Sequence, residues 1–179
     1  MMERKVTLED MLGCREKRAE RQKETLSRYG VPVVSVTLVW PGEVKDTEAS
    51  RYAMEQALWS LDNALETLNI FPRLRRCDFP VTGAEAIYSV NMDVSALKRL
   101  CVGLEDIHPL GRLWDLDVIG VNGHPASRTE IGLSPRCCLL CDEQAHVCVR
   151  TRAHDVKQLL STIHRSIDDF KQSVEATGT

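Results

Sequence analysis

Apolar residues recur every three or four positions in three segments, which predicts helices that each bury one face, and cap signals predict a fourth helix near the start of the chain. The three longer helices are expected over residues 7–28, 47–69 and 154–173. Thr7 and Asp10 form a capping-box pattern at the first start, and Gly30 and Pro32 end that helix. A shorter helix should begin after Asp93, an N-cap residue that precedes another apolar stripe.

Alternating apolar and polar residues predict β-strands between these helices. The strands are expected over residues 33–40, 75–81, 86–92, 114–121 and 136–141. Asn122-Gly123 is a strong hairpin signal, so the chain should return along the fourth strand to about Ser127, with Pro125 restricting that return to a sheet edge or a ragged end. Because the elements mix without a regular βαβ rhythm, we expect an α+β fold with a mixed or antiparallel sheet packed with helices.

Length and composition limit the class of protein. The 179 residues are 43% hydrophobic, which is enough for a buried core, and we expect a single domain over 1–179. A net charge of −3 gives no general attraction to nucleic acid or to acidic membranes. The first residues lack an apolar export signal, and the longest apolar run, 31–40, is too short to cross a membrane. We therefore expect a cytoplasmic protein with reduced cysteines and with neither nucleic acid nor membrane as a partner.

Two acidic residues stand out in the stretch His-Pro-Leu-Gly-Arg-Leu-Trp-Asp-Leu-Asp-Val over residues 108–118. Strand side chains alternate, so Asp115 and Asp117 should share one face, about 7 Å apart along the strand. Together they could hold a divalent cation such as Mg²⁺ beside a phosphate. The alternative is an ordinary solvated strand face, but Asp is rare in strands. Gly111-Arg112, just ahead of the strand, adds a flexible backbone and a cation that could meet phosphates.

Basic residues that could bind a phosphate-rich ligand lie on both sides of this strand. They are Lys45 upstream and Arg128, Arg136, Arg150 and Arg152 downstream. For any one of them, a solvated surface charge is the simpler interpretation. The helix of the N-terminal segment 1–30 is also basic in its second half, and Arg18, Arg21 and Arg28 fall on one side of it. That face is either solvated or a docking surface for an acidic protein.

A cluster of cysteines follows in the last third of the chain. Cys138-x-x-Cys141 has metal-knuckle spacing, and Cys148 and His154 could complete a tetrahedral zinc site. Against zinc, the chain has no second Cys-x-x-Cys pair, and the Leu139-Leu140 insert is typical of a buried strand. We therefore favour buried thiols. The alternative function is a zinc-stabilised binding or regulatory module built on Cys138, Cys141 and Cys148.

These residues resemble a known family, the apo-citrate lyase phosphoribosyl-dephospho-CoA transferases, which are the holo-acyl carrier protein synthases of citrate lyase. The resemblance covers nearly the whole chain. Its most specific parts are Gly-Arg-Leu-Trp-Asp-Leu-Asp over 111–117 and Cys-Leu-Leu-Cys over 138–141. It also includes Arg15, the segments 31–35, 41–42 and 45–46, Ser127-Arg128, Pro135-Arg136, Cys148-Val149-Arg150 and His154.

The resemblance implies an enzyme that transfers phosphoribosyl-dephospho-CoA from triphosphoribosyl-dephospho-CoA to a serine of the citrate lyase acyl carrier protein, with release of diphosphate. Asp115 and Asp117 would be catalytic and would hold Mg²⁺. The implied substrate-binding residues are Gly111, Arg112, Arg128, Arg136 and Arg150, with Lys45 and His108 as further candidates.

The paired acids also look like those of the nucleotidyltransferase superfamily, which suggests a nucleotidyltransferase-like fold. The sequence departs from that pattern, because Gly111-Arg112 stands only two residues ahead of Asp115, where superfamily members place Gly-Ser well ahead. A third acid is common there, and Asp142 or Glu143 could supply it.

Overall fold

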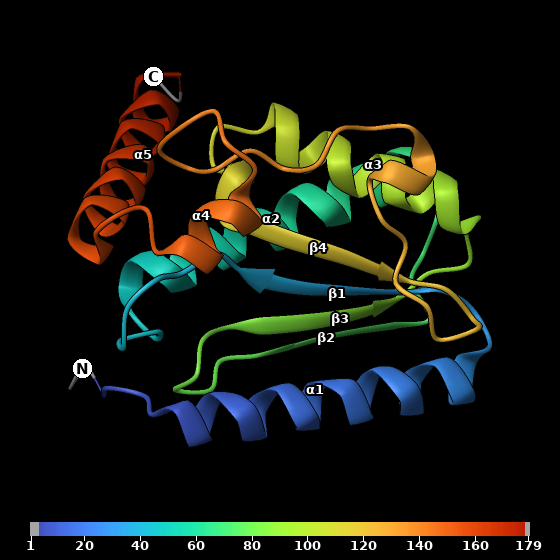
Figure 1. Cartoon of the computed structure of the whole chain (residues 1–179). Helices are drawn as coiled ribbons and strands as arrows, with labels where there is room; N and C mark the ends of the chain where they lie inside the picture. The colour runs from blue at the N-terminus through green and yellow to red at the C-terminus, as the bar shows by residue number, and fades with distance from the viewer. Residues whose placement is uncertain (1–3, 178–179) are drawn as a thin grey trace.

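One antiparallel sheet organises the chain in the computed structural model, which describes residues 4–177 (Figure 1). The four strands lie in the order β2-β3-β1-β4 and span Val33–Leu38 (β1), Leu74–Asp78 (β2), Glu85–Ser89 (β3) and Trp114–Ile119 (β4). The helices span Leu8–Tyr29 (α1), Glu48–Thr67 (α2), Val94–Ile107 (α3), Ala145–Thr151 (α4) and Val156–Thr177 (α5). The α+β class and the antiparallel sheet are confirmed.

The helix starts predicted from sequence are formed by side-chain caps. Thr7 and Asp10 make both bonds of a capping box at α1, and Gly30 ends that helix in the left-handed conformation at φ 63°. The N-cap of α2 is Thr47, whose hydroxyl accepts from the backbone N–H of Ser50 at 3.0 Å. Asp93 caps α3 as expected. Local polar residues therefore set where three helices begin.

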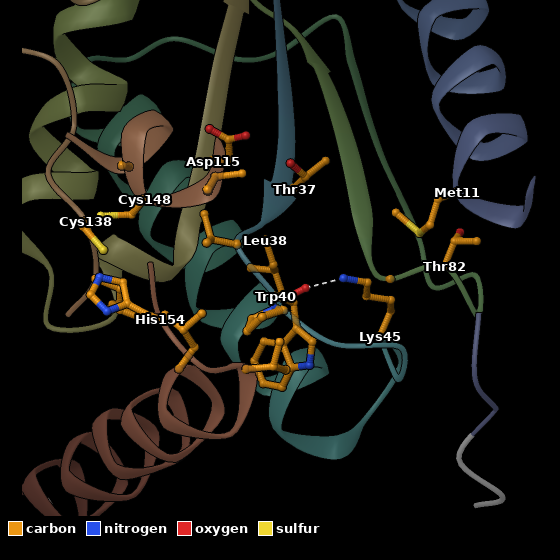
Figure 2. Close-up of a pocket in the computed structure, with 18 of the residues that line it drawn as sticks. Met11, Thr37, Leu38, Trp40, Lys45, Thr82, Asp115, Cys138, Cys148 and His154 are labelled. Carbon is orange, nitrogen blue, oxygen red and sulfur yellow. Dashed lines mark hydrogen bonds between the residues drawn. The ribbon is translucent and has the colours of Figure 1, made fainter. Parts of the chain in front are cut away.

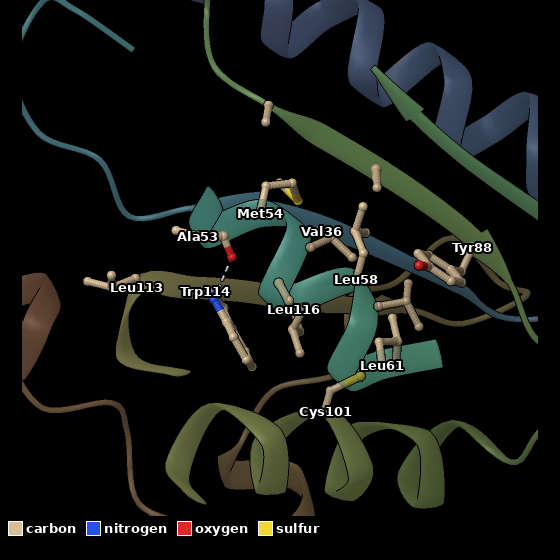
Figure 3. Packing of buried hydrophobic residues seen from close by; sticks show 14 of the residues in the cluster. Val36, Ala53, Met54, Leu58, Leu61, Tyr88, Cys101, Leu113, Trp114 and Leu116 are labelled. Carbon is tan, nitrogen blue, oxygen red and sulfur yellow. Dashed lines mark hydrogen bonds between the residues drawn. The ribbon is translucent and has the colours of Figure 1, made fainter. Parts of the chain in front are cut away.

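The core lies between one face of the sheet and helices α2 and α3 (Figure 3). Alternate residues of β1 and β4 enter it, and they include Val34, Val36, Trp114, Leu116 and Val118. Trp114 is fully buried, and its indole N–H donates to the backbone carbonyl of Ala53 at 3.0 Å. Burial of the apolar face of β4 fixes the register of the strand, so its acidic residues must face the other way.

Helix α1 packs on β1 and β3 from the opposite face of the sheet. Arg18 donates to Glu85 of β3 at 2.8 Å, and Arg21 pairs with the second oxygen of the same carboxylate. The Glu85 side chain is only 7% exposed, so these pairs join the helix to the sheet. Two of the three arginines that suggested a docking surface are thus bound internally.

One predicted strand is wrong, and another is present only as a ragged return. Residues 136–141 form a loop with one isolated bridge, Cys137 to Gln144, and the return after Asn122-Gly123 is reduced to a bridge between Ile119 and Pro125. Side chains of α3 limit strand pairing at the outer edge of β4. Lys98 Nζ donates to the carbonyl of Leu116 at 3.1 Å. Glu105 accepts from the N–H of the same residue at 2.7 Å. Leu116 therefore has no backbone group left for a further strand, and the returning chain pairs with β4 only near its end, where the N–H of Ala126 donates to the carbonyl of Val118 at 2.8 Å.

The helices of residues 4–177 include none that is long and apolar enough to cross a membrane.

Gly111 has a packing role at the turn between α3 and β4. A Cβ atom there would lie 2.4 Å from the carbonyl oxygen of Glu105 and 2.5 Å from that of Leu104. We expect Gly111→Ala to lower the free energy of unfolding by about 2 kcal/mol or more, because backbone must shift. Gly103→Ala in α3 is the matched control: it meets nothing within 4 Å and should be neutral or stabilising by up to about 1 kcal/mol. Urea unfolding compares the two, and equal effects would contradict this packing role.

Candidate functional site

The paired carboxylates lie on the face of β4 that the core leaves open. Asp115 stands opposite Thr37 of β1, and Asp117 stands opposite Ser35. The Asp115 side chain is 46% exposed, and Asp117 is also exposed, whereas their neighbours Trp114, Leu116 and Val118 are buried. The predicted alternation is therefore confirmed.

The two carboxylates influence each other electrostatically. Partial desolvation of the carboxylate by the surrounding protein, followed by the negative charge of Asp115, raises the pKa of Asp117 to about 6. Lys98 and Arg136 oppose that shift. A bound cation would reduce the electrostatic repulsion between the two carboxylates, and carboxylate oxygens are ligands that Mg²⁺ prefers. The donor set therefore fits a hard divalent cation.

A cavity of about 730 Å³ lies over these carboxylates, and we call it the arginine cavity. Six of the nine residues predicted to bind or act on substrate line it: Arg112, Asp115, Asp117, Arg128, Arg136 and Arg150. Ser127, Thr129, Lys98 and Glu105 line it as well. The fold thus gathers residues that are spread over three separate stretches of the sequence.

A larger cavity of about 990 Å³ lies beside it, among α1, the end of β1 and the start of α5 (Figure 2). Its apolar lining includes Met11, Leu38, Trp40 and Leu159, and its cations include Arg15 and Lys45. Asp115 lines both cavities, so they meet at this carboxylate. We call the second space the apolar cavity.

Glu105 of α3 lines the arginine cavity, and the sequence interpretation did not predict it there. Its side chain is 3% exposed, and one oxygen lies 2.8 Å from Arg136, while the other lies 2.6 Å from Arg128. The first oxygen also accepts from the N–H of Leu116 at 2.7 Å. A signal was present in the sequence, because Lys98 and Glu105 fall among the apolar residues of the predicted helix after Asp93. Charged residues on an apolar stripe are buried only when they are paired.

The arginines of the cavity differ in what they already bind. Arg128, 14% exposed, pairs with Glu105 and with Asp106 at 3.0 Å. Arg112 donates to the backbone carbonyls of Cys137 and Cys138. Arg136 donates to the carbonyl of Trp114 at 2.6 Å and lies 4.0 Å from the carboxylate of Asp115. These bonds hold the cavity walls together, and Arg150 is exposed at the rim.

Lys45 lines the apolar cavity, as do Arg15 and Arg152, and it does not line the arginine cavity. Its ammonium donates to the backbone carbonyl of Trp40 (Figure 2). Burial, and then the charge of Arg15, lower the pKa of Lys45. Within residues 4–177 no carboxylate forms an ion pair with either cation, so the two together favour an anionic ligand.

The remaining candidates lie outside both cavities. Gly111 is buried under the end of α3. The His108 ring packs against Trp114 and Phe170, with ring centroids 4.4 and 4.9 Å apart, and burial lowers its pKa. Asp142 and Glu143, considered for a third acid, line neither cavity. Besides the β4 pair, the acids among the lining residues are Asp155 in the apolar cavity and Glu105 in the arginine cavity, and Glu105 is already paired.

The cysteine candidates do converge. Cys138, Cys141, Cys148 and His154 bring their ligand atoms within 4.8 Å of one another. The first three are free thiols, as are all seven cysteines of the chain.

Comparison with known proteins identifies the class as an enzyme, specifically a transferase. Residues 6–170 match the family described as apo-citrate lyase phosphoribosyl-dephospho-CoA transferase. A relative of that name from Escherichia coli O1:K1 is 36% identical over 165 residues, which is 92% of this chain and 90% of the relative. Another relative of that name, from E. coli O157:H7, is 34% identical over 164 residues, which is also 92% of this chain and 90% of the relative. "Protein CitXG" of Haemophilus influenzae is 38% identical over 160 residues, 89% of this chain, and the match spans 34% of that longer protein.

The chain belongs to the apo-citrate lyase phosphoribosyl-dephospho-CoA transferase family. The predicted family and the prediction of an enzyme are both confirmed.

The buried Glu105 network should be a major source of stability. We expect Glu105→Gln to lower the free energy of unfolding by about 3–5 kcal/mol, because two arginines lose the charge that balances them inside the protein. Asp106→Asn is the matched control, since it removes the other partner of Arg128, a side chain that is 56% exposed, and should cost less than about 1 kcal/mol. Urea unfolding of the two variants tests this, and a similar loss in both would contradict it.

Proposed function

We propose that this protein transfers phosphoribosyl-dephospho-CoA from triphosphoribosyl-dephospho-CoA to a serine of the citrate lyase acyl carrier protein and releases diphosphate. Family membership and the names of the relatives support the reaction class and the carrier. The observation that carries the site is the position of Asp115, at the junction of two cavities that contain cations. Free thiols throughout the chain agree with an enzyme that works in the cytoplasm.

The donor is long and strongly anionic, and the two cavities suit its two parts. Its phosphates lie at the junction, where Arg136 and Arg150 approach from the arginine cavity and Lys45 and Arg15 from the apolar cavity. A guanidinium has five N–H donors, so Arg136 can keep its bond to Glu105 and still bind phosphate. The apolar cavity takes the less polar part of the donor against Leu38 and Trp40.

In the transfer step the carrier serine oxygen forms a bond to the α-phosphorus, and the bond from that phosphorus to the diphosphate oxygen breaks. One of the two β4 carboxylates accepts the serine proton. Arg136 and Arg150 bind the departing diphosphate, because its negative charge increases as it leaves. Glu105 acts indirectly, by holding Arg136 beside Asp115.

Asp115 and Asp117 would hold Mg²⁺, which when bound would neutralise charge on the phosphates. Their shared strand face and mutual repulsion support this role. A pair of acids on an antiparallel sheet also supports a nucleotidyltransferase-like fold and chemistry, which we keep as part of the proposal.

Intact-mass spectrometry of apo acyl carrier protein tests the reaction directly. The carrier is incubated with this protein and triphosphoribosyl-dephospho-CoA, with Mg²⁺ or with EDTA. We expect a mass gain of one phosphoribosyl-dephospho-CoA on the carrier with Mg²⁺, and no gain with EDTA. An unmodified carrier in both samples, with folded protein, would overturn the proposed function. A gain that persists in EDTA would overturn the metal role alone.

Asp115→Asn should lower kcat/KM on the order of 10³-fold, because removal of a metal-binding carboxylate costs several kcal/mol of transition-state stabilisation. The half-exposed side chain lies outside the core, so the melting temperature should hardly change. Asp142→Asn is the matched control, since it removes an exposed carboxylate that lines neither cavity. Near-normal rates for Asp115→Asn in Mg²⁺ would contradict the assigned role.

A further inference from the structure

Three elements that follow one another in the chain bring the cysteine cluster together. Cys138 and Cys141 lie in the loop after Arg136, Cys148 lies in α4, and His154 lies in the link to α5. Cys141 Sγ is 3.5 Å from Cys148 Sγ and 3.3 Å from Nε2 of His154. Figure 2 shows Cys138, Cys148 and His154 together on one side of the apolar cavity.

The loop around Cys138 has the local geometry of a metal knuckle. It is closed by hydrogen bonds from Cys138 N–H to the carbonyl of Glu143 at 2.6 Å and from Ala145 N–H to that of Arg136 at 2.9 Å. A tight loop of this kind brings Cys138 and Cys141 close together, as two ligands of one metal must be. The Leu139-Leu140 insert is thus part of a tight loop and not of a strand, which removes one of the two sequence objections to zinc.

We propose that Cys138, Cys141, Cys148 and His154 form a structural zinc site. In a tetrahedral site the Zn–S bonds are about 2.3 Å and the Zn–N bond about 2.0 Å, so ligand atoms lie roughly 3.5–3.8 Å apart. The separations of 3.3 and 3.5 Å are close to these values, and all four ligand atoms lie within 4.8 Å of one another, so a small adjustment closes the site around a metal. Thiolate and imidazole select zinc over the hard cations that carboxylates prefer. Four protein ligands leave no open position, so the metal has a structural role.

The zinc site holds the wall that separates the two cavities. Leu139, Ala145 and Val149 lie between the ligands in sequence and line both cavities. The backbone carbonyl of Cys138 accepts from Arg112, which ties the site to the start of β4. Arg152 adopts the left-handed conformation at φ 51°, which turns the chain from α4 toward His154. Because α4 also carries Arg150, the metal fixes this arginine relative to the carboxylates.

The alternative states of the cluster are chemically distinct. Reduced thiols without metal would react with thiol reagents and bind no zinc. Oxidation would join Cys141 and Cys148, whose sulfur atoms are already in contact, and would remove two hydrogens from the mass of the chain. Neither state depends on the transferase reaction, so the zinc site and the proposed function fail separately.

Metal analysis of the full-length protein, purified under reducing conditions without added chelator, is the test. We expect about one zinc per chain by inductively coupled plasma mass spectrometry, released by a mercurial reagent. Replacement by Co²⁺ should give the visible bands of a tetrahedral site and a thiolate-to-cobalt charge-transfer band. Chelation should lower the melting temperature, because metal binding contributes to folding.

Variants locate the site. Loss of a supporting group around a metal commonly costs 10–100-fold in affinity, so we expect Cys148→Ser, which removes a ligand, to weaken zinc binding more than about 100-fold. Cys137→Ser is the matched control: this exposed thiol adjoins Cys138 but is not in the cluster, and its loss should leave zinc content unchanged. If Cys148→Ser does not fold, the cobalt spectrum of the wild-type protein still decides. A metal-free wild-type protein, an oxidised Cys141–Cys148 pair, or a cobalt spectrum without thiolate bands would overturn the proposal.

Discussion

The candidate site depends on one buried carboxylate, that of Glu105, at the open edge of β4. It accepts hydrogen bonds from the backbone N–H of Leu116 and from Arg128, it forms an ion pair with Arg136, and its side chain is 3% exposed. An unpaired charge at such a position would be prohibitive, so carboxylate and arginines must be buried together. Through them α3 ends the sheet, anchors the segment after Ile119, and places Arg136 beside Asp115.

The segment from Arg136 to His154 forms the wall between the two cavities, and each of its ends is held by polar contacts. Arg136 begins the segment and is held by Glu105, and His154 ends it among the proposed zinc ligands. Between them, Leu139, Ala145 and Val149 divide the arginine cavity from the apolar cavity. Loop segments open more easily than packed helices and strands, so anchored ends keep this wall in place. The Arg136–Glu105 ion pair and the proposed zinc site therefore fix the two ends of the wall.

Local patterns in the sequence were sufficient for most of the fold. Capping residues such as Thr7 and Asp93 and the alternation around Asp115 depend only on nearby positions, and the structure has them as predicted. The prediction of a strand over 136–141 was wrong, because this segment forms a loop. The backbone of Leu116 in β4 is bound instead by Lys98 and Glu105. The contacts of Lys98 and Glu105 with β4 join residues that are distant in sequence, so a local pattern cannot predict them.

The same distinction holds for the site. The Asp115 and Asp117 pair is a local pattern, and the cavity collected most of the arginines predicted beside it. What each arginine binds was not predictable, because it depends on Glu105 and on backbone carbonyls of the cysteine loop. The contribution of Lys45 from a separate cavity likewise follows only from the three-dimensional packing.

The central claim is that phosphates of the donor bind at the junction of the cavities, beside the β4 carboxylates. A crystal structure with triphosphoribosyl-dephospho-CoA and Mn²⁺ in place of Mg²⁺ tests it most directly. We predict an anomalous peak between Asp115 and Asp117, with phosphate oxygens in contact with Arg136 and Arg150. Phosphates bound away from β4, with no metal peak at either carboxylate, would contradict the claim.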